Sequence, residues 1–417
     1  MIYKRLLFTI FFILLGTCYM QAMVYDNRYF PLFQRNITMV NQEPSAFGLE
    51  LFYSSGDSAW DMKDILIGIP ELYGFFDLDT LAKGMEAVGF PNPLPTEWQG
   101  GSIAYSVSGK IESVGCGFSW HQAITDQWAF GASWLCMGVQ SSQIFRLLTE
   151  IENRTNRTTN LRLREGDLLL LDSIRRQAFD TIGITQNHVS KGGFGDIDMY
   201  LQYGDQWEYQ LKCRSVKAAG RLGVLFPTGV THNPDIPASI PFGGNGHWGI
   251  YGSGLATFEI KEDIFVGALL RVSQRFKRTT MQRVSVAGEP AIFGALVVPV
   301  SITPGATVIC SPFVILENVR KGFALGLTYT LTVHKADRWC SQCDKADIIN
   351  QLAITSKLSQ WGSSYVTLSA QYDFGKVKVE RNFAPILSFR WDWPVGLFVT
   401  KQVVKSNKIS LDLDFVF

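Results

Sequence analysis

The stretch that decides the fold is Asn407–Phe417, which reads NKISLDLDFVF. Apolar side chains occupy every second position of it from Ile409, and serine or aspartate lies between them until Val416. Because successive side chains of a strand point to opposite faces, the stretch is predicted to be a strand with one apolar and one charged face. The apolar face would cover a core in a soluble sandwich, or meet lipid in a membrane-spanning barrel. The rest of the chain distinguishes these two folds.

The same alternation recurs along the chain. Residues 323–334 place Phe, Leu, Tyr and Val on one face, and Ala, Gly, Thr and His on the other. Strands are predicted in this way near residues 46–54, 98–122, 128–140, 193–205, 208–226, 246–260, 263–277, 302–317, 321–336, 363–374, 383–393 and 407–417.

The connections between these strands alternate between long and short. Membrane barrels have long loops at one end, short turns at the other and an even number of strands. The chain is therefore predicted to be all-β, a transmembrane antiparallel up-and-down β-barrel of twelve strands with helical insertions in its long loops. Within 98–122 the apolar phase changes between Val107 and Val114, so a bulge near Gly109 is expected. The alternative is two strands there and another split elsewhere, which makes fourteen.

The N-terminus has the layout of a secretory signal peptide. Lys4 and Arg5 precede the apolar run Leu6–Leu15, and smaller or polar residues follow to Ala22. Residues 1–22 are predicted to be a cleaved signal, with a retained membrane anchor as the alternative, and residues 23–417 form one barrel domain. No later apolar run approaches the roughly 18 residues of a membrane helix, so contact with a membrane is expected through strands.

Two long loops carry helical patterns. Residues 141–192 are predicted to be a helical insertion, because Ile144, Leu147, Leu148 and Ile151 recur at helical spacing and Asp167–Phe179 is rich in leucine. Asp61–Val88 is predicted to be partly helical. Such insertions would either fold over the mouth of a pore or decorate the surface.

Charged residues on the polar faces are the candidate functional residues. In a barrel they would face the lumen, where a ring of charges selects ions and a set of paired charges closes the passage. The candidates for the lumen lining are Arg221, Glu259, Lys261, Arg271, Arg275, Asp373, Arg390 and Asp392. Twelve strands lie between the eight that side chains can fill and the sixteen that leave an open channel, so a narrow or gated passage is expected.

The C-terminal pattern resembles the assembly signal of Gram-negative outer-membrane proteins. Phe415 and Phe417 match its aromatic end, and Asp412 stands where the signal has glycine. The segments Gly193–Ile197 and Gly223–Gly229 resemble strand edges in the long-chain fatty-acid and aromatic-hydrocarbon transporter group. The resemblance implies a bacterial outer-membrane location, with lipid and the barrel-assembly machinery as partners.

Few residues suggest other chemistry. Cys340 and Cys343 form a CxxC, which is expected to be a disulfide or an idle pair, with a metal site or redox function as alternatives. His247 and His334 are candidates to lie close together, but ordinary polar lining is expected, and no G-x-S-x-G nucleophile motif occurs. We therefore expect that the chain is not an enzyme and needs no cofactor. The counts of 38 Lys+Arg and 37 Asp+Glu leave no nucleic-acid-binding footprint.

Together these observations predict an outer-membrane pore or transporter for passive passage of small solutes through a charge-lined lumen. The alternatives are a structural or adhesive barrel without conductance, a barrel hydrolase and a soluble β-sandwich. The sequence decides neither the substrate nor the oligomeric state.

Overall fold

A computed structural model describes residues 27–32, 45–149, 159, 166–341, 346–376 and 384–416. The predicted signal peptide at residues 1–22 lies outside these ranges and stays a prediction. None of the helices in the described part of the chain is long and apolar enough to cross a membrane.

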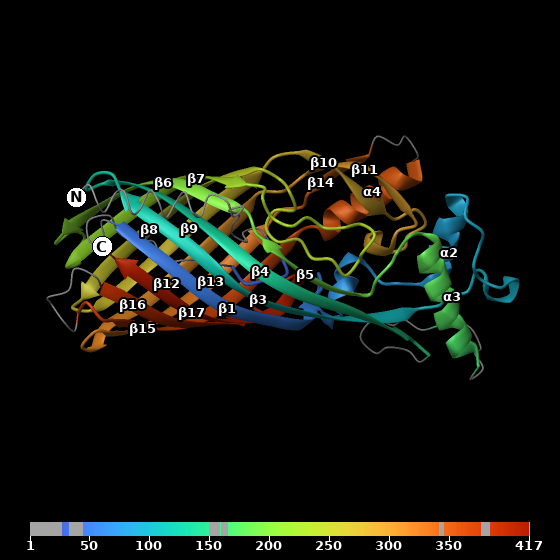
Figure 1. Ribbon diagram of the computed structural model, residues 1–417, viewed down its shortest axis with the longest axis horizontal. Helices are drawn as coiled ribbons and strands as arrows, with labels where there is room; N and C mark the ends of the chain where they lie inside the picture. The colour runs from blue at the N-terminus through green and yellow to red at the C-terminus, as the bar shows by residue number, and fades with distance from the viewer. Residues whose placement is uncertain are drawn as a thin grey trace.

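Antiparallel strands close into a barrel (Figure 1). The sheet holds fourteen strands, of which β2 (Leu66–Ile67) and β5 (His188–Phe194) lie off the ring, so twelve strands form the barrel. The prediction of twelve is confirmed and the alternative of fourteen is wrong. The barrel strands are β1 (Ser45–Trp60), β3 (Tyr105–Ala123), β4 (Trp128–Leu147), β6 (Ile197–Glu208), β7 (Ser215–Phe226), β8 (Gly249–Lys261), β9 (Ile264–Arg275), β12 (Thr307–Arg320), β13 (Phe323–His334), β15 (Trp361–Asp373), β16 (Ala384–Pro394) and β17 (Val403–Val416).

The C-terminal strand closes the ring. β17 pairs with β1 from Ala46↔Val416 to Trp60↔Val403, which removes the free edge that an open sheet would expose. Leu411 is 46% exposed on the outside, whereas Asp412 is 3% exposed on the inside. A closed barrel with an apolar outer face satisfies its backbone hydrogen bonds within lipid, so this is the architecture of a membrane-spanning barrel.

The apolar phase of β3 changes without a bulge. Its pairing with β4 runs without interruption from Tyr105↔Leu147 to Ala123↔Ala129, so the expected bulge near Gly109 is wrong. Tyr105 and Val107 are buried on the inner face, and Val114 is exposed on the outer face. The phase changes because the two halves of β3 have different surroundings. Around Tyr105 and Val107 the inward side chains pack against apolar loops, whereas around Val114 the outward side chains face lipid.

The long loops build a second layer at one end of the barrel, which we call the long-loop end; the opposite end is the short-turn end (Figure 1). The sheet β10-β11-β14 lies there beside α4, and α2 and α3 lie farthest from the barrel. The elements of this layer are η1 (Ile69–Tyr73), α2 (Leu78–Ala87), η2 (Thr96–Trp98), α3 (Asp167–Thr181), β10 (Arg278–Val284), η3 (Ala291–Phe293), β11 (Leu296–Thr303), β14 (Arg338–Ser341) and α4 (Ala346–Leu358).

The helical predictions are confirmed in part. α3 covers the leucine-rich stretch, and η1 and α2 lie within Asp61–Val88. A helix at Ile144 and Leu147 is wrong, because both belong to β4, whose hydrogen bonds with β3 continue as far as Leu147. Ile151 lies outside the described residues.

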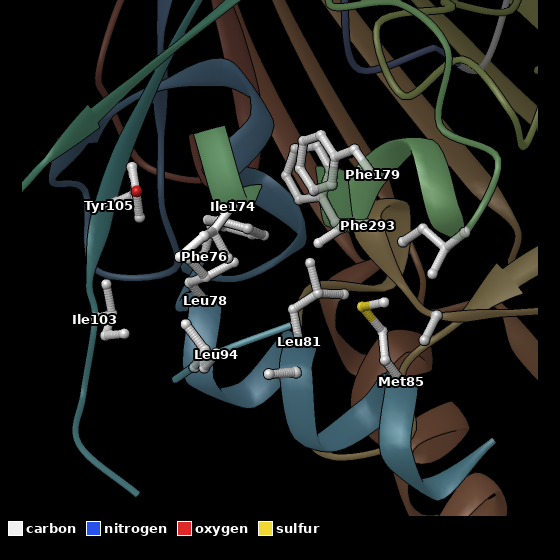
Figure 2. Packing of buried hydrophobic residues seen from close by; sticks show 14 of the residues in the cluster. Phe76, Leu78, Leu81, Met85, Leu94, Ile103, Tyr105, Ile174, Phe179 and Phe293 are labelled. Carbon is white, nitrogen blue, oxygen red and sulfur yellow. The ribbon is translucent and has the colours of Figure 1, made fainter. Parts of the chain in front are cut away.

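An aromatic core holds the distal loops together, and we call it the outer cap (Figure 2). Phe76 is fully buried and its ring meets four others edge to face, those of Tyr105, Phe145, Phe179 and Phe293. These rings come from β3, β4, α3, η3 and the segment before α2. Aromatic pairs in this geometry add about 0.5–1.5 kcal/mol each beyond the burial of their area. The outer cap is therefore a packed unit.

Candidate functional site

The barrel interior holds a cavity of about 360 Å³, the lower cavity, which reaches toward the short-turn end. Inward positions of the barrel strands line it, and many of them are polar or charged. Of the eight predicted lumen residues, Arg221, Arg271, Arg390 and Asp392 line this cavity.

One wall of the lower cavity is an ion network on three neighbouring strands. Arg390 of β16 donates to Asp412 of β17 from Nε at 2.7 Å and from Nη2 at 2.8 Å, and its Nη2 lies 3.3 Å from Glu50 of β1. Lys408 Nζ lies 3.0 Å from Glu50 and 3.5 Å from Asp392. With Asp414 of β17, which also lines the cavity, this wall holds four carboxylates and two cations, which sum to −2 when all are ionised.

The other charged wall lies on β6, β7 and β9. Arg271 lies 3.5 Å from Asp198 and its guanidinium lies 3.4 Å from the centre of the Tyr251 ring. Arg221 donates from Nε to Gln202 at 2.7 Å. With Lys217, which also lines the cavity, three cations and one carboxylate sum to +2 when all are ionised.

The two charged walls face each other across the lumen. In the ring of twelve strands β7 and β16 are six strands apart, and so are β9 and β1. Six places is half of the ring, so these strands are diametrically opposed. A solute in the lower cavity therefore lies in an electric field directed from one wall to the other.

The N-terminal residues 27–32, which we call the N-terminal plug, lie inside the barrel. Tyr29 and Phe30 are buried in an apolar layer with inward side chains such as Phe52, Leu135 and Leu225. The backbone carbonyl of Arg28 accepts a 3.0 Å hydrogen bond from Val404 N, and Asn27 Nδ2 donates to the carbonyl of Pro241 at 2.9 Å. The plug thus joins strands and loops that are far apart in the sequence.

A second cavity of about 190 Å³, the upper cavity, lies on the other side of the plug. Asn27, Arg28 and Tyr29 line the upper cavity, and Pro31 and Leu32 line the lower one. The plug and its apolar layer therefore separate two cavities along one barrel.

The upper cavity has polar and aromatic walls supplied by the long-loop end. His232 and His247 line it, and each holds Nδ1 close to a backbone carbonyl, that of Ser239 at 2.9 Å and that of Phe276 at 2.8 Å. Burial lowers the pKa of both imidazoles, so both are neutral at pH 7. Apart from the histidines, the charged groups among the described lining residues are the guanidinium groups of Arg28, Arg275 and Arg283 and the carboxylate of Asp337.

A buried ion pair fixes the wall of the upper cavity at the junction of β5 and β6. Arg275 Nη1 lies 2.7 Å from Oδ2 of Asp196, which is 0% exposed. Asp196 also accepts the backbone N–H groups of Gly229 at 3.2 Å and Gly244 at 2.7 Å. A Cβ at Gly244 would lie 1.8 Å from Arg275 Nη1, so this position requires glycine. The two segments that resemble the transporter group, at 193–197 and 223–229, thus lie side by side around Asp196.

The remaining predicted lumen residues lie near the ends of the barrel. Arg275 lines the upper cavity. Glu259 accepts Ser215 Oγ at 2.9 Å, Asp373 accepts the N–H of Gly375 at 2.8 Å, and Lys261 is exposed as the last residue of β8. These last three residues lie at the short-turn end, away from the ion network.

The predicted assembly signal and disulfide are described only in part. Phe415 is paired with Phe47 on β1, and Phe417 lies outside the described residues. Cys340 on β14 is exposed, and Cys343 lies outside the described residues, so their pairing stays a prediction.

The two candidate histidines line the same cavity. His334 contacts Thr307 Oγ1 through Nδ1 at 2.8 Å and Asp337 through Nε2 at 2.9 Å. This chain of contacts has the residue types of a hydrolase triad, but Thr307 is 1% exposed, so its hydroxyl is covered from any solute. We therefore interpret His334 as part of the cavity wall.

Sequence reasoning missed several members of the site. Glu50 and Lys408 occupy polar phases of predicted strands, so the signal that identified Arg390 could have found both. Asp198 likewise lies in phase with Gln202 on β6. The N-terminal plug has no periodicity that would place it inside the barrel.

Comparisons with known proteins find similar folds. No protein-family model matches the chain, and no curated protein is similar to it in sequence. The similar solved structures include an outer-membrane channel from Pseudomonas putida F1, with a TM-score of 0.49, 10% identity and coverage of 93% of this chain and 99% of that one. They also include a FadL homologue from Pseudomonas aeruginosa, with a TM-score of 0.30, 9% identity and 90% coverage of both chains. The CymD monoaromatic hydrocarbon channel has a TM-score of 0.30, 8% identity and coverage of 90% and 89%.

Proposed function

We propose that the chain is an outer-membrane channel through which small solutes pass between the upper and lower cavities. The observation that carries the proposal is the position of the N-terminal plug, which separates two cavities inside one closed barrel. Passage then requires movement of the plug and no change in the barrel.

The contacts of the plug suit such a movement. The barrel strands are held by ladders of backbone hydrogen bonds, whereas the contacts of the plug with other described residues are a few single hydrogen bonds and the packing of Tyr29 and Phe30. Local opening is easiest where few backbone hydrogen bonds must break. The plug can therefore shift while the β1–β17 seam stays closed.

The charged walls of the lower cavity give the passage its selectivity. A solute there meets a wall of net charge −2 on β16, β17 and β1 and a wall of net charge +2 on β6, β7 and β9. Polar solutes that align with this field are stabilised relative to apolar ones. The mechanism is diffusion, and we propose no catalytic step and no cofactor for it. Lipid surrounds the barrel in this proposal, and the barrel-assembly machinery inserts it.

Single-channel recording in planar bilayers tests the proposal. The variant Tyr29→Ala/Phe30→Ala removes the two rings that fill the apolar layer, and we expect several-fold more open time or conductance than in the wild type. The matched control is Phe398→Ala, which removes a ring that is 88% exposed outside the lumen and leaves the recordings unchanged.

Folding is checked by heat-modifiable migration in electrophoresis, which reports the closed barrel. If folded and inserted protein gives no channel events in either the wild type or the plug variant, the channel proposal is wrong. A structural or adhesive barrel is then the better interpretation.

A further inference from the structure

We propose that the lower cavity binds a tetrahedral oxyanion that carries a proton, such as hydrogen phosphate. Arg221 and Arg271, which we call the arginine pair, hold the anion, and Asp198 accepts a hydrogen bond from its hydroxyl group. The inference deepens the proposed function, on which it rests in so far as the bound anion is a passing solute.

Two tyrosine rings support the arginine pair. Tyr200 and Tyr251 each lie across a glycine of the neighbouring strand, where a Cβ would overlap the ring. Arg221 Cζ lies 4.3 Å from the centre of the Tyr200 ring, and Arg271 Cζ lies 3.4 Å from the centre of the Tyr251 ring. Each guanidinium therefore rests on a ring that itself rests on the barrel wall. The two glycines are Gly131 and Gly223.

The arginine pair lies at one level of the barrel. Arg221 of β7 is in register with Ser253 of β8, which is in register with Arg271 of β9. All three residues line the lower cavity. Both guanidinium groups interact electrostatically with the same carboxylate, that of Asp198 on β6. The two side chains therefore converge on one part of the cavity wall.

The arginine pair suits an oxyanion. A guanidinium that is stacked on an aromatic ring still presents N–H donors at its edge, and such donors bind carboxylate and phosphate oxygens. Arg221 is fixed further by the 2.7 Å hydrogen bond from its Nε to Gln202. With Asp198 ionised, the arginine pair and this carboxylate sum to +1, and Lys217 adds a positive charge in the same cavity. An anion is therefore attracted to this wall.

Asp198 decides which anion fits. Its Oδ2 lies 3.5 Å from Arg271 Nη1, and the carboxylate also accepts a hydrogen bond from Tyr251. Its Oδ1 is buried and accepts no hydrogen bond from any residue that the structure describes. A buried acceptor is stabilised by a donor, so a ligand that brings an O–H group fits this oxygen. A carboxylate or sulfate ion carries no such proton, and Asp198 would repel it.

A second buried polar atom lies beside the arginine pair. His121 of β3 lines the same cavity and is 4% exposed. Its Nδ1 lies 3.3 Å from the Tyr200 hydroxyl, and its Nε2 has no hydrogen-bond partner within the described part of the chain. Arg221 interacts electrostatically with this imidazole. The site thus offers the ligand a further polar contact beside Arg221.

Calorimetric titration of the full chain in detergent tests the inference with inorganic phosphate as the probe. Sulfate is the ligand control, because at about pH 8 it has the shape and charge of hydrogen phosphate and lacks the proton. We expect phosphate to bind about tenfold or more tightly than sulfate, since sulfate leaves Asp198 Oδ1 without a donor. Arsenate, which carries a proton as phosphate does, should bind like phosphate. Equal affinities for phosphate and sulfate, or no phosphate binding, would overturn the inference.

Substitutions separate the roles of the residues. Arg221→Gln is expected to lower phosphate affinity about tenfold or more, and Arg221→Lys to lower it less. Asp198→Asn is expected to bring the affinities for phosphate and sulfate close together, because an amide can donate a hydrogen bond to sulfate. Arg176→Gln is the matched control, because Arg176 lies on α3 with a side chain that is 71% exposed. Unchanged phosphate affinity in folded Arg221→Gln, or an unchanged preference in folded Asp198→Asn, contradicts the inference.

Heat-modifiable migration shows whether each variant is folded. A changed ratio of phosphate to sulfate affinity in folded Asp198→Asn is an effect that a loss of stability does not produce. If Arg221→Gln lacks the heat-modifiable band, Arg221→Lys together with the comparison of phosphate and sulfate on the wild type decides.

Channel recordings on the same preparations separate the two proposals. Phosphate binding that depends on Arg221 without any conductance leaves the oxyanion site in place and overturns the channel. Conductance without phosphate binding overturns the oxyanion site alone.

Discussion

Arg390 and Asp412 face each other from neighbouring strands inside the barrel, joined by two hydrogen bonds of 2.7 and 2.8 Å. Asp412 stands where the outer-membrane assembly signal has glycine, and this contact supplies the physical reason. A glycine there would remove both of these hydrogen bonds, and Glu50 would remain as a carboxylate at 3.3 Å from the guanidinium. The ion network thus explains the departure from the signal.

Asp412→Asn is expected to destabilise the barrel by about 1.5–3 kcal/mol, because it removes the charge from a bidentate ion pair while it keeps the size of the side chain. The temperature at which the heat-modifiable band converts measures the change. Asp57→Asn on the exposed side of β1 is the control and leaves that temperature unchanged. Equal conversion temperatures for both variants would show that the pair does not stabilise the fold.

Phe76→Ala is expected to loosen the outer cap and to leave the barrel intact. Its ring contacts four others, and truncation of a buried phenylalanine costs about 3–5 kcal/mol. Limited proteolysis should cut the loops that carry α2 and α3 faster, with no change in the heat-modifiable band. Leu169→Ala, at an 81% exposed position of α3, is the control. Loss of the band in Phe76→Ala would mean that cap and barrel fold as one unit.

The sequence predicts the barrel well because lipid imposes one rule on every strand. Outward positions such as Leu411 and Val114 must be apolar, so period-two alternation places all twelve strands and their order. The rule stops at the membrane surface. Beyond it, Tyr105 and Val107 turn their apolar face inward against the outer cap. Alternation shows this change of phase before Val114 without its cause, so it predicts a bulge that the strand does not have.

The candidate site is less predictable, for two physical reasons. Phase shows that Arg390 and Asp392 point inward, but Glu50, which contacts Arg390 and Lys408, comes from β1, and only the closure of the ring brings β1 beside β17. The N-terminal plug is placed by packing and by single hydrogen bonds to distant loops. Such contacts leave no periodic pattern in the sequence.

Gly244→Ala is expected to destabilise the long-loop end. The new Cβ would lie 1.8 Å from Arg275 Nη1, so the guanidinium must leave Asp196 and a buried carboxylate loses its partner. Breaking a buried pair costs about 3–5 kcal/mol. The temperature at which the heat-modifiable band converts measures this loss of stability. Gly138→Ala is the matched control, since a Cβ there meets nothing within 4 Å. If both alanine variants behave alike, the Asp196–Arg275 pair is not the cause.

Charge removal on the two walls of the lower cavity is expected to shift ion selectivity in opposite directions. Arg221→Gln takes a positive charge from the β7 wall, so the reversal potential in a KCl gradient should move toward the potassium equilibrium potential. Asp414→Asn removes a negative charge on β17 and should move it toward the chloride value. Arg176→Gln on α3 is the control for a charge outside the lumen, with no shift expected. Because fixed charges act within a Debye length of about 10 Å at 0.1 M salt, both shifts should shrink at 1 M KCl. Shifts of the same sign for both lumen variants would mean that the walls do not act as opposed charges, and that selectivity arises elsewhere along the passage.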